Sequence, residues 1–184
     1  ERGEMASFTK RAILISFFRM CTKKSPDKIT VRDIVDDCEI NRNTFYYYFE
    51  DIYALVQELF VLASQDFCNA CREGNIREGI LSLQKLVEDN TAAMRNLYLS
   101  FGYRMEGYYL FATEEGWIAW LRQTAEGKKA GEEALRYVAD SYAAMFFSLM
   151  RKQLGKGKNA DIPAATERFI RVWIPLAGKA LEGY

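Results

Sequence analysis

The sequence predicts an all-α protein. Apolar residues recur at helical spacing along most of the 184 residues, and no stretch shows the strict alternation of a half-buried strand. Only three prolines interrupt this pattern, Pro26, Pro163 and Pro175. Because 49% of the residues are hydrophobic, a chain of this length can bury a substantial core.

Helical spacing and the breaks between apolar stretches give the order of the elements. Ser25-Pro26-Asp27 ends the first helix, because proline lacks an amide hydrogen and restricts the residue before it. The sequence does not set the boundaries between Phe101 and Glu114. We expect helices over about Thr9–Lys23, Val31–Cys38, Arg42–Phe49, Tyr53–Cys71, Ile76–Asn90, Thr91–Phe101, Glu114–Thr124, Glu132–Leu154 and Pro163–Leu181.

Cap residues define the two short helices near the N-terminus. Thr30 is a good N-cap, and Asp33 three positions later makes an approximate capping box. Glu39-Ile40 forms a tight break, after which Asn41 can cap the next helix. Two short helices joined by a tight turn and preceded by a longer helix match the helix-turn-helix pattern.

The third helix divides its aromatic residues between two faces. At 100° per residue, Phe45 and Phe49 share the side that can meet Ile34, Cys38 and Ile40 in a core. The outward set is Asn43, Thr44, Tyr46 and Tyr47, with Tyr48 partly buried. This set contains no acid, and its groups suit base edges and phosphate oxygens. The alternative is that the tyrosines pack under a neighbouring domain.

The stretch from Thr30 to Leu55 closely resembles the DNA-binding signature of TetR-family transcriptional regulators, and the resemblance extends over about Thr9 to Phe60. The run Phe-Tyr-Tyr-Tyr-Phe-Glu-Asp-Ile-Tyr resembles the subgroup that includes dihydroxyacetone-kinase operon regulators. The resemblance implies an N-terminal three-helix helix-turn-helix domain over residues 1–52 and a C-terminal helical ligand-binding and dimerisation domain over residues 53–184. It also implies contacts to double-stranded DNA from Thr30, Arg32, Asn41, Arg42, Asn43, Thr44, Tyr46, Tyr47 and Tyr48.

Two residues depart from the family pattern. Glu39 stands where the turn usually has glycine, so we expect a slightly wider turn. Ile52 replaces a lysine that usually meets phosphate, so we expect one backbone contact to be lost.

The same resemblance implies a homodimer on a palindromic operator and a small-molecule effector that changes DNA binding, with repression as the commoner behaviour. Wide apolar stripes on the last two long helices suit a dimer interface that includes Tyr142, Phe146, Leu149, Phe169 and Trp173. Aromatic residues crowd the segment from Tyr98 to Trp120, and candidate ligand-binding residues there are Phe101, Tyr103, Tyr108, Tyr109, Trp117 and Trp120. Burial in the core of a monomer is the alternative for both sets.

Composition excludes several function classes. The chain has no histidine, which removes Ser-His-Asp and Cys-His catalytic groups and histidine-containing metal sites. We expect no metal, no cofactor and no enzyme activity. The four cysteines occupy apolar positions and are expected to be reduced core thiols, namely Cys21, Cys38, Cys68 and Cys71.

Three other inferences complete the sequence-based prediction. No apolar run is long enough to span a bilayer and no signal-peptide layout is present, so we expect a cytoplasmic protein without a membrane partner. The net charge is zero, so any nucleic-acid surface has to be local. Two alternatives to a ligand-responsive regulator remain: an all-α small-molecule-binding protein or enzyme, and a regulator that acts through a protein partner with weakened DNA binding.

Overall fold

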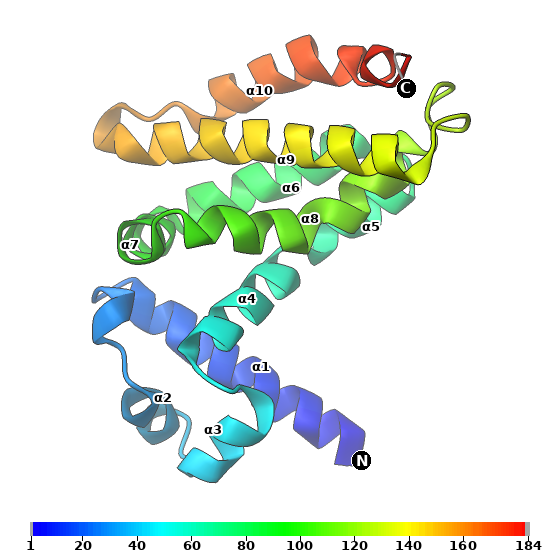
Figure 1. Ribbon diagram of the computed structural model, residues 1–184. Helices are drawn as coiled ribbons and strands as arrows, with labels where there is room; N and C mark the ends of the chain where they lie inside the picture. Colours follow the sequence, from blue (N-terminus) through cyan, green and yellow to red (C-terminus); the bar gives the residue numbers. More distant parts are fainter. Residues whose placement is uncertain (1, 183–184) are drawn as a thin grey trace.

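The computed structural model describes residues 2–182 and the side chains of residues 8–182, and every regular element in that range is helical, which confirms the all-α class (Figure 1). No helix there is both long and apolar enough to cross a membrane. The α-helices are α1 (Arg2–Cys21), α2 (Val31–Asp37), α3 (Arg42–Tyr48), α4 (Ile52–Ala63), α5 (Gln65–Arg72), α6 (Ile76–Asp89), α7 (Thr91–Phe101), α8 (Arg104–Leu121), α9 (Glu132–Gly155) and α10 (Ile162–Trp173).

The helices form two groups that are connected through α4 and through the packing of α7 against α1 (Figure 1). Helices α1, α2 and α3 lie together at one end of the molecule, and α5 to α10 form a bundle at the other. Helix α4 packs against α1 in the first group and against α8 in the second. Any displacement of α4 relative to the bundle therefore moves a helix that supports the N-terminal group.

Side-chain caps define the short helices as the sequence predicts. The Thr30 hydroxyl accepts a hydrogen bond from the Asp33 amide at 3.2 Å, and the Asp33 carboxylate accepts one from the Thr30 amide at 2.8 Å. This capping box holds the pKa of Asp33 at about 2, mainly through the Thr30 amide. The Asn41 side chain accepts from the Thr44 amide at the start of α3.

The core of the N-terminal group is the one expected from the helical wheel. Phe45 and Ile34 are fully buried, and Phe49 is nearly so. They lie in the same hydrophobic cluster as Ile13 and Phe17 of α1. Helix α1 is thus the support on which the two short helices are held.

Three helix boundaries differ from the sequence prediction. The stretch predicted as one helix from Tyr53 to Cys71 breaks at Ser64, because α4 packs on α1 and α8 whereas α5 packs on α6 and α8. Helix α8 begins at Arg104, through the region whose boundaries the sequence left open. The last predicted helix ends at Trp173 and continues as 3₁₀ turns, since Pro175 cannot donate to an α-helical hydrogen bond.

The bundle is closed by close contact between α5 and α8. A Cβ atom at Gly116 would lie 2.7 Å from the Phe67 ring and 3.2 Å from the Cα of Cys68, so only glycine permits this approach. Cys21, Cys68 and Cys71 are buried free thiols, and Cys38 is half-buried, as expected. Burial raises the pKa of Cys21 and Cys71 to about 12, so these thiols stay protonated.

Candidate functional site

The outward face of α3 is the most exposed concentration of aromatic and amide groups near the N-terminus. Tyr47 is 78% exposed and Tyr46 is 54% exposed, although both belong to a helix whose opposite side is core. Asn43 and Arg42 are exposed as well. Tyr48 is half-buried and packs its ring edge-on to Tyr47, with ring centroids 4.9 Å apart. No part of the bundle covers this face (Figure 1).

Two of the predicted DNA-contacting residues, Thr30 and Asn41, already serve as helix caps, and a third, Thr44, is hydrogen-bonded to one of these caps. The Thr30 hydroxyl accepts from the Asp33 amide and donates to its carboxylate. The Asn41 carbonyl oxygen accepts from the amide and the hydroxyl of Thr44. The side-chain amide hydrogens of Asn41 remain available to a phosphate, whereas the Thr44 hydroxyl hydrogen is already used.

The turn between α2 and α3 is tighter than expected. Glu39 adopts a left-handed conformation, with φ of 54°, in the position that favours glycine. The Ile40 amide donates to the Val35 carbonyl at 3.0 Å, and the Glu39 amide donates to the Asp36 carbonyl at 3.4 Å. These two bonds make the Schellman motif that ends a helix. The expected widening of the turn is therefore wrong, and the cost of a non-glycine residue is carried as backbone strain at Glu39.

Contacts from α1 hold α2 in place. The Asp37 carboxylate accepts a hydrogen bond from the Ser16 hydroxyl and pairs with the Arg19 guanidinium, each at 2.5 Å. The Ser16 hydrogen bond and the Arg19 charge hold the pKa of Asp37 below its ordinary value. Asp37 is the last residue of α2, so these contacts fix the helix end from which the turn and α3 continue.

Positive charge is sparse around α3. Residues 18–59 contain eight carboxylates and six cationic side chains, so the region as a whole does not attract DNA. Arg32 pairs with Asp36 at 3.5 Å, with both side chains exposed. Arg42 makes no ion pair with any described residue and lies in the first turn of α3. Ile52 is half-buried against the core and offers no group to phosphate.

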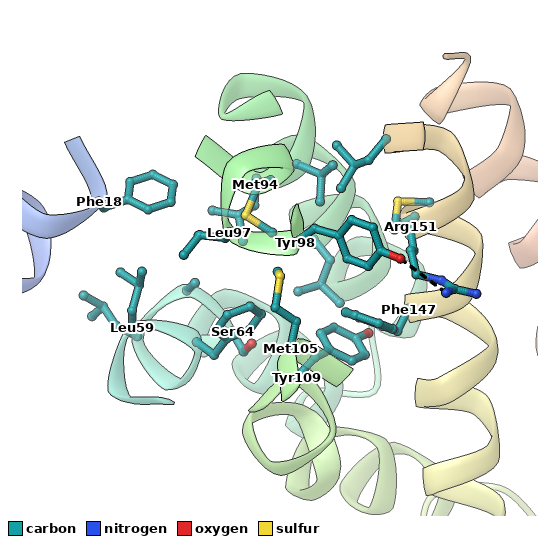
Figure 2. A pocket seen from close by; sticks show the side chains of 18 of the residues that line it. Phe18, Leu59, Ser64, Met94, Leu97, Tyr98, Met105, Tyr109, Phe147 and Arg151 are labelled. Atoms are coloured by element: carbon teal, nitrogen blue, oxygen red, sulfur yellow. Dashed lines mark hydrogen bonds between the residues drawn. The ribbon is translucent and has the colours of Figure 1, made fainter. Parts of the chain in front are cut away.

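A second candidate site is a cavity of about 250 Å³ between the two groups of helices (Figure 2). Its wall is almost entirely apolar and is formed by α1, α4, α6, α7, α8 and α9. Phe18 of α1 and Leu59 of α4 lie on one side, and Phe147 and Arg151 of α9 lie on the other. Ser64, at the break between α4 and α5, also lines it. An occupant would touch both the support of the helix-turn-helix unit and the bundle.

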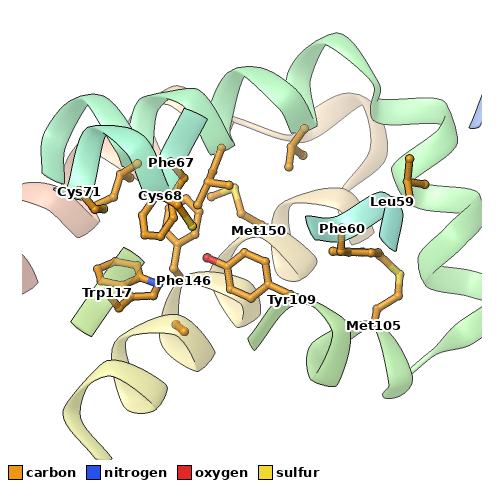
Figure 3. Packing of buried hydrophobic residues seen from close by; sticks show 14 of the residues in the cluster. Leu59, Phe60, Phe67, Cys68, Cys71, Met105, Tyr109, Trp117, Phe146 and Met150 are labelled. Atoms are coloured by element: carbon orange, nitrogen blue, oxygen red, sulfur yellow. The ribbon is translucent and has the colours of Figure 1, made fainter. Parts of the chain in front are cut away.

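The few polar groups in the wall differ in their surroundings. Arg151 donates to the Tyr98 hydroxyl at 3.4 Å (Figure 2). The Tyr109 hydroxyl is buried without a hydrogen-bond partner among the described residues, as is the indole nitrogen of Trp117. Burial raises the pKa of the Tyr109 phenol. Its hydroxyl points toward the side of the core that contains Phe146 and Trp117 (Figure 3).

The six predicted ligand-binding residues do not come together. Tyr109 lines the cavity, but Phe101 and Tyr103 line a separate surface depression beside Tyr53. Trp117 and Trp120 are buried against each other in the core, with ring centroids 6.2 Å apart. Tyr108 is half-buried against Phe60. Tyr98 begins the aromatic segment found in the sequence but was not among the six candidates, although it lines the cavity. Sequence reasoning missed Arg151, because no local pattern marks an arginine on an apolar helix as part of a cavity wall.

Most of the predicted dimer residues lie inside the protomer. Tyr142, Phe146 and Phe169 are at most 4% exposed and pack with one another, so they offer no surface to a partner. Leu149 is half-buried. Trp173 is 43% exposed. The large apolar stripes of α9 and α10 are thus mainly core, because these helices pack against α8 and α6 as well as against each other.

No cluster of three or more Cys, Asp or Glu side chains in the described part of the chain could hold a metal ion. The two candidate sites are thus the exposed face of α3 and the apolar cavity.

Comparison with known proteins agrees with this arrangement. Residues 18–59 match the family described as bacterial regulatory proteins, tetR family. No curated protein sequence matches the chain. The dihydroxyacetone kinase operon activator DhaS has a similar fold, with a TM-score of 0.63 and 18% identity over 96% of this chain and 97% of that chain.

A second similar structure is the TetR family repressor AlkX from Dietzia sp., described as implicated in biodegradation of n-alkanes. Its TM-score is 0.66 and its identity is 15%, over 94% of this chain and 97% of that chain. The subgroup resemblance seen in the sequence agrees with the likeness to DhaS, which at this identity concerns the fold. Residues 18–59 are therefore a TetR-family helix-turn-helix domain, the DNA-binding domain of bacterial transcriptional regulators, in a chain that has the TetR-regulator fold.

Proposed function

We propose that this chain is a ligand-responsive transcriptional regulator that binds a palindromic operator as a homodimer. The exposed, acid-free face of α3 is the observation that supports this function most directly. Asn43, Tyr46, Tyr47 and Arg42 supply amide, phenol and guanidinium donors on one short helix, which fits a major groove. Residues 1–52 form the DNA-binding unit in this proposal, and residues 53–184 bind the ligand and the second protomer.

Operator binding can be tested with DNA from upstream of the protein's own gene. We expect a specific shifted complex whose affinity falls as salt rises, because arginine contacts to phosphate release counterions. If Arg32 and Arg42 of two protomers supply the cations, the slope of log K against log salt should be about −4. Binding that is equal on unrelated DNA, or absent at low salt, would contradict the proposal.

Dimerisation has a physical motive, since one helix of this length distinguishes few base pairs. The exposed apolar side chains of α9 and α10 and the turn that follows support an interface there: Tyr137, Val172, Trp173 and Leu176. The Tyr142 hydroxyl donates to the Trp173 carbonyl at 2.9 Å, so the middle of α9 lies beside the end of α10.

Trp173→Glu tests this interface by light scattering. We expect the mass of the particle to fall from two chains to one, because a charge cannot be buried there without a partner. Phe111→Glu is the matched control, since Phe111 is 61% exposed on α8 and lies outside the proposed interface. An unchanged dimer in Trp173→Glu would exclude this face.

Ligand binding in the cavity would change operator affinity only if the ligand prefers one arrangement of α1 and α4. We propose repression that the ligand relieves, which is the commoner behaviour of the family that the sequence resembles. A reporter gene downstream of the operator would show higher expression when the gene for this protein is deleted. Lower expression after deletion would make the protein an activator.

The acidic surroundings of α3 favour a second candidate, a regulator that acts through a protein partner with weakened DNA binding. Eight carboxylates in residues 18–59 repel phosphate, and Ile52 offers no cation. The same binding experiment separates the two candidates, because only the first predicts a specific complex with DNA alone.

A further inference from the structure

The cavity wall contains one cationic side chain, Arg151. Its only polar contact among the described residues is the Tyr98 hydroxyl, and no carboxylate pairs with it. Arg136 on the same helix, in contrast, is paired with Glu114 and Glu132. A guanidinium at an apolar cavity without an acidic partner is available to an anion from outside the chain.

Tyr98 adds a second donor at the same place. Its hydroxyl accepts the hydrogen bond from Arg151, which leaves its own hydrogen free to donate to an anion beside the guanidinium. Arg151 is also an exposed residue, so a charged group bound there would keep part of its hydration. The cost of burying a lone charge, which an apolar cavity would otherwise impose, is therefore reduced.

The rest of the wall suits an extended apolar chain. Met94 and Leu97 of α7, Met105 of α8 and Leu59 of α4 line the space between Arg151 and Phe18 (Figure 2). These side chains offer no hydrogen-bond donors to a polar occupant. An occupant that binds Arg151 at one end thus places its other end against α1 and α4.

We propose that the effector is an elongated amphiphile with a single carboxylate or similar anionic head group at Arg151 and Tyr98, and an apolar tail that extends toward Phe18. This inference rests on the proposed ligand response and specifies the chemical class of the ligand. The head group fixes the molecule on α9, and the tail reaches the helix that supports the DNA-binding unit.

Calorimetric titration of the full-length protein with decanoate and with 1-decanol tests the head group. We expect decanoate to bind at least about tenfold more tightly than decanol. A charge-assisted hydrogen bond to Arg151 contributes about 1.4 kcal/mol or more of binding free energy, which corresponds to this tenfold difference in affinity. Arg151→Met should remove this preference by weakening decanoate about tenfold. Lys152→Met is the matched control, since it removes the neighbouring exposed cation outside the cavity wall and should change decanoate affinity by less than about twofold.

Circular dichroism of both variants establishes that they are folded. Equal binding of decanoate and decanol, no effect of Arg151→Met, or equal effects of the two substitutions would each overturn the anionic head group. Failure of every probe to bind would overturn the ligand class as a whole. Specific operator binding by the ligand-free protein is measured separately, so its loss would instead refute the proposed regulator.

Discussion

Two aromatic-rich regions of this chain behave in opposite ways. In α3, Phe45 and Phe49 are buried while Tyr46 and Tyr47 are exposed, as the helical wheel predicts. In the aromatic segment of α7 and α8, the helical wheel does not distinguish the aromatic residues that line a cavity from those that fill the core. A short helix with one core face sorts its side chains locally, whereas a helix surrounded by neighbours is sorted by whichever helix meets each side.

Phe45→Ala should have the largest effect and bears on the buried side of α3. The ring is fully buried in the hydrophobic core, so its removal should cost about 3–5 kcal/mol in free energy of unfolding. Urea denaturation followed by circular dichroism measures this loss. An effect below about 1 kcal/mol would mean that α3 is not packed as described.

Tyr47→Ala tests the exposed side of the same helix. We expect the melting temperature to stay nearly unchanged, because the ring is 78% exposed, while operator affinity falls. A loss of about 1 kcal/mol in each of two protomers would weaken binding about 30-fold. Fluorescence anisotropy with labelled operator measures the affinity. A large drop in melting temperature with intact DNA binding would place Tyr47 in a core instead.

Tyr109→Phe tests a buried aromatic residue of the bundle, in contrast to the exposed tyrosines of α3. The Tyr109 hydroxyl is buried without a hydrogen-bond partner in the described part of the chain, so its removal should stabilise the fold by up to about 1 kcal/mol rather than weaken it. Thermal denaturation of the variant measures the change. A clear loss of stability would show that the hydroxyl is hydrogen-bonded in solution. Tyr108→Phe, at a half-buried neighbouring position, is the control for loss of a phenol oxygen.

Glu39→Gly should have the smallest effect and concerns the turn before α3. Glycine adopts the observed φ of 54° without steric cost, so we expect a gain of roughly 0.5–1 kcal/mol in stability. Glu39→Ala, which keeps a Cβ atom and removes only the charge, separates backbone strain from electrostatics. Equal gains in the two variants would show that the carboxylate, and not the backbone conformation, is responsible.

The local features of the N-terminal unit were predictable from the sequence. Thr30, Asp33 and Asn41 cap helices through groups a few residues away, so their roles follow from short-range spacing. The division of α3 into buried and exposed faces follows from its period. The geometry at Glu39 was not predictable, because residue type alone suggested a wider turn, whereas the turn is closed by the backbone hydrogen bonds from Glu39 and Ile40 to the end of α2.

The tertiary structure decided which apolar residues are core and which form surfaces. Phe146 and Phe169 belong to strongly apolar helices, a pattern that fits both a core position and a dimer interface. Their contact with each other inside the protomer depends on how α9 and α10 pack together. Arg151 and Phe18 line one cavity although 133 positions separate them in the sequence. Helical periodicity records which side of a helix is apolar, and only the packing of helices determines what that side meets.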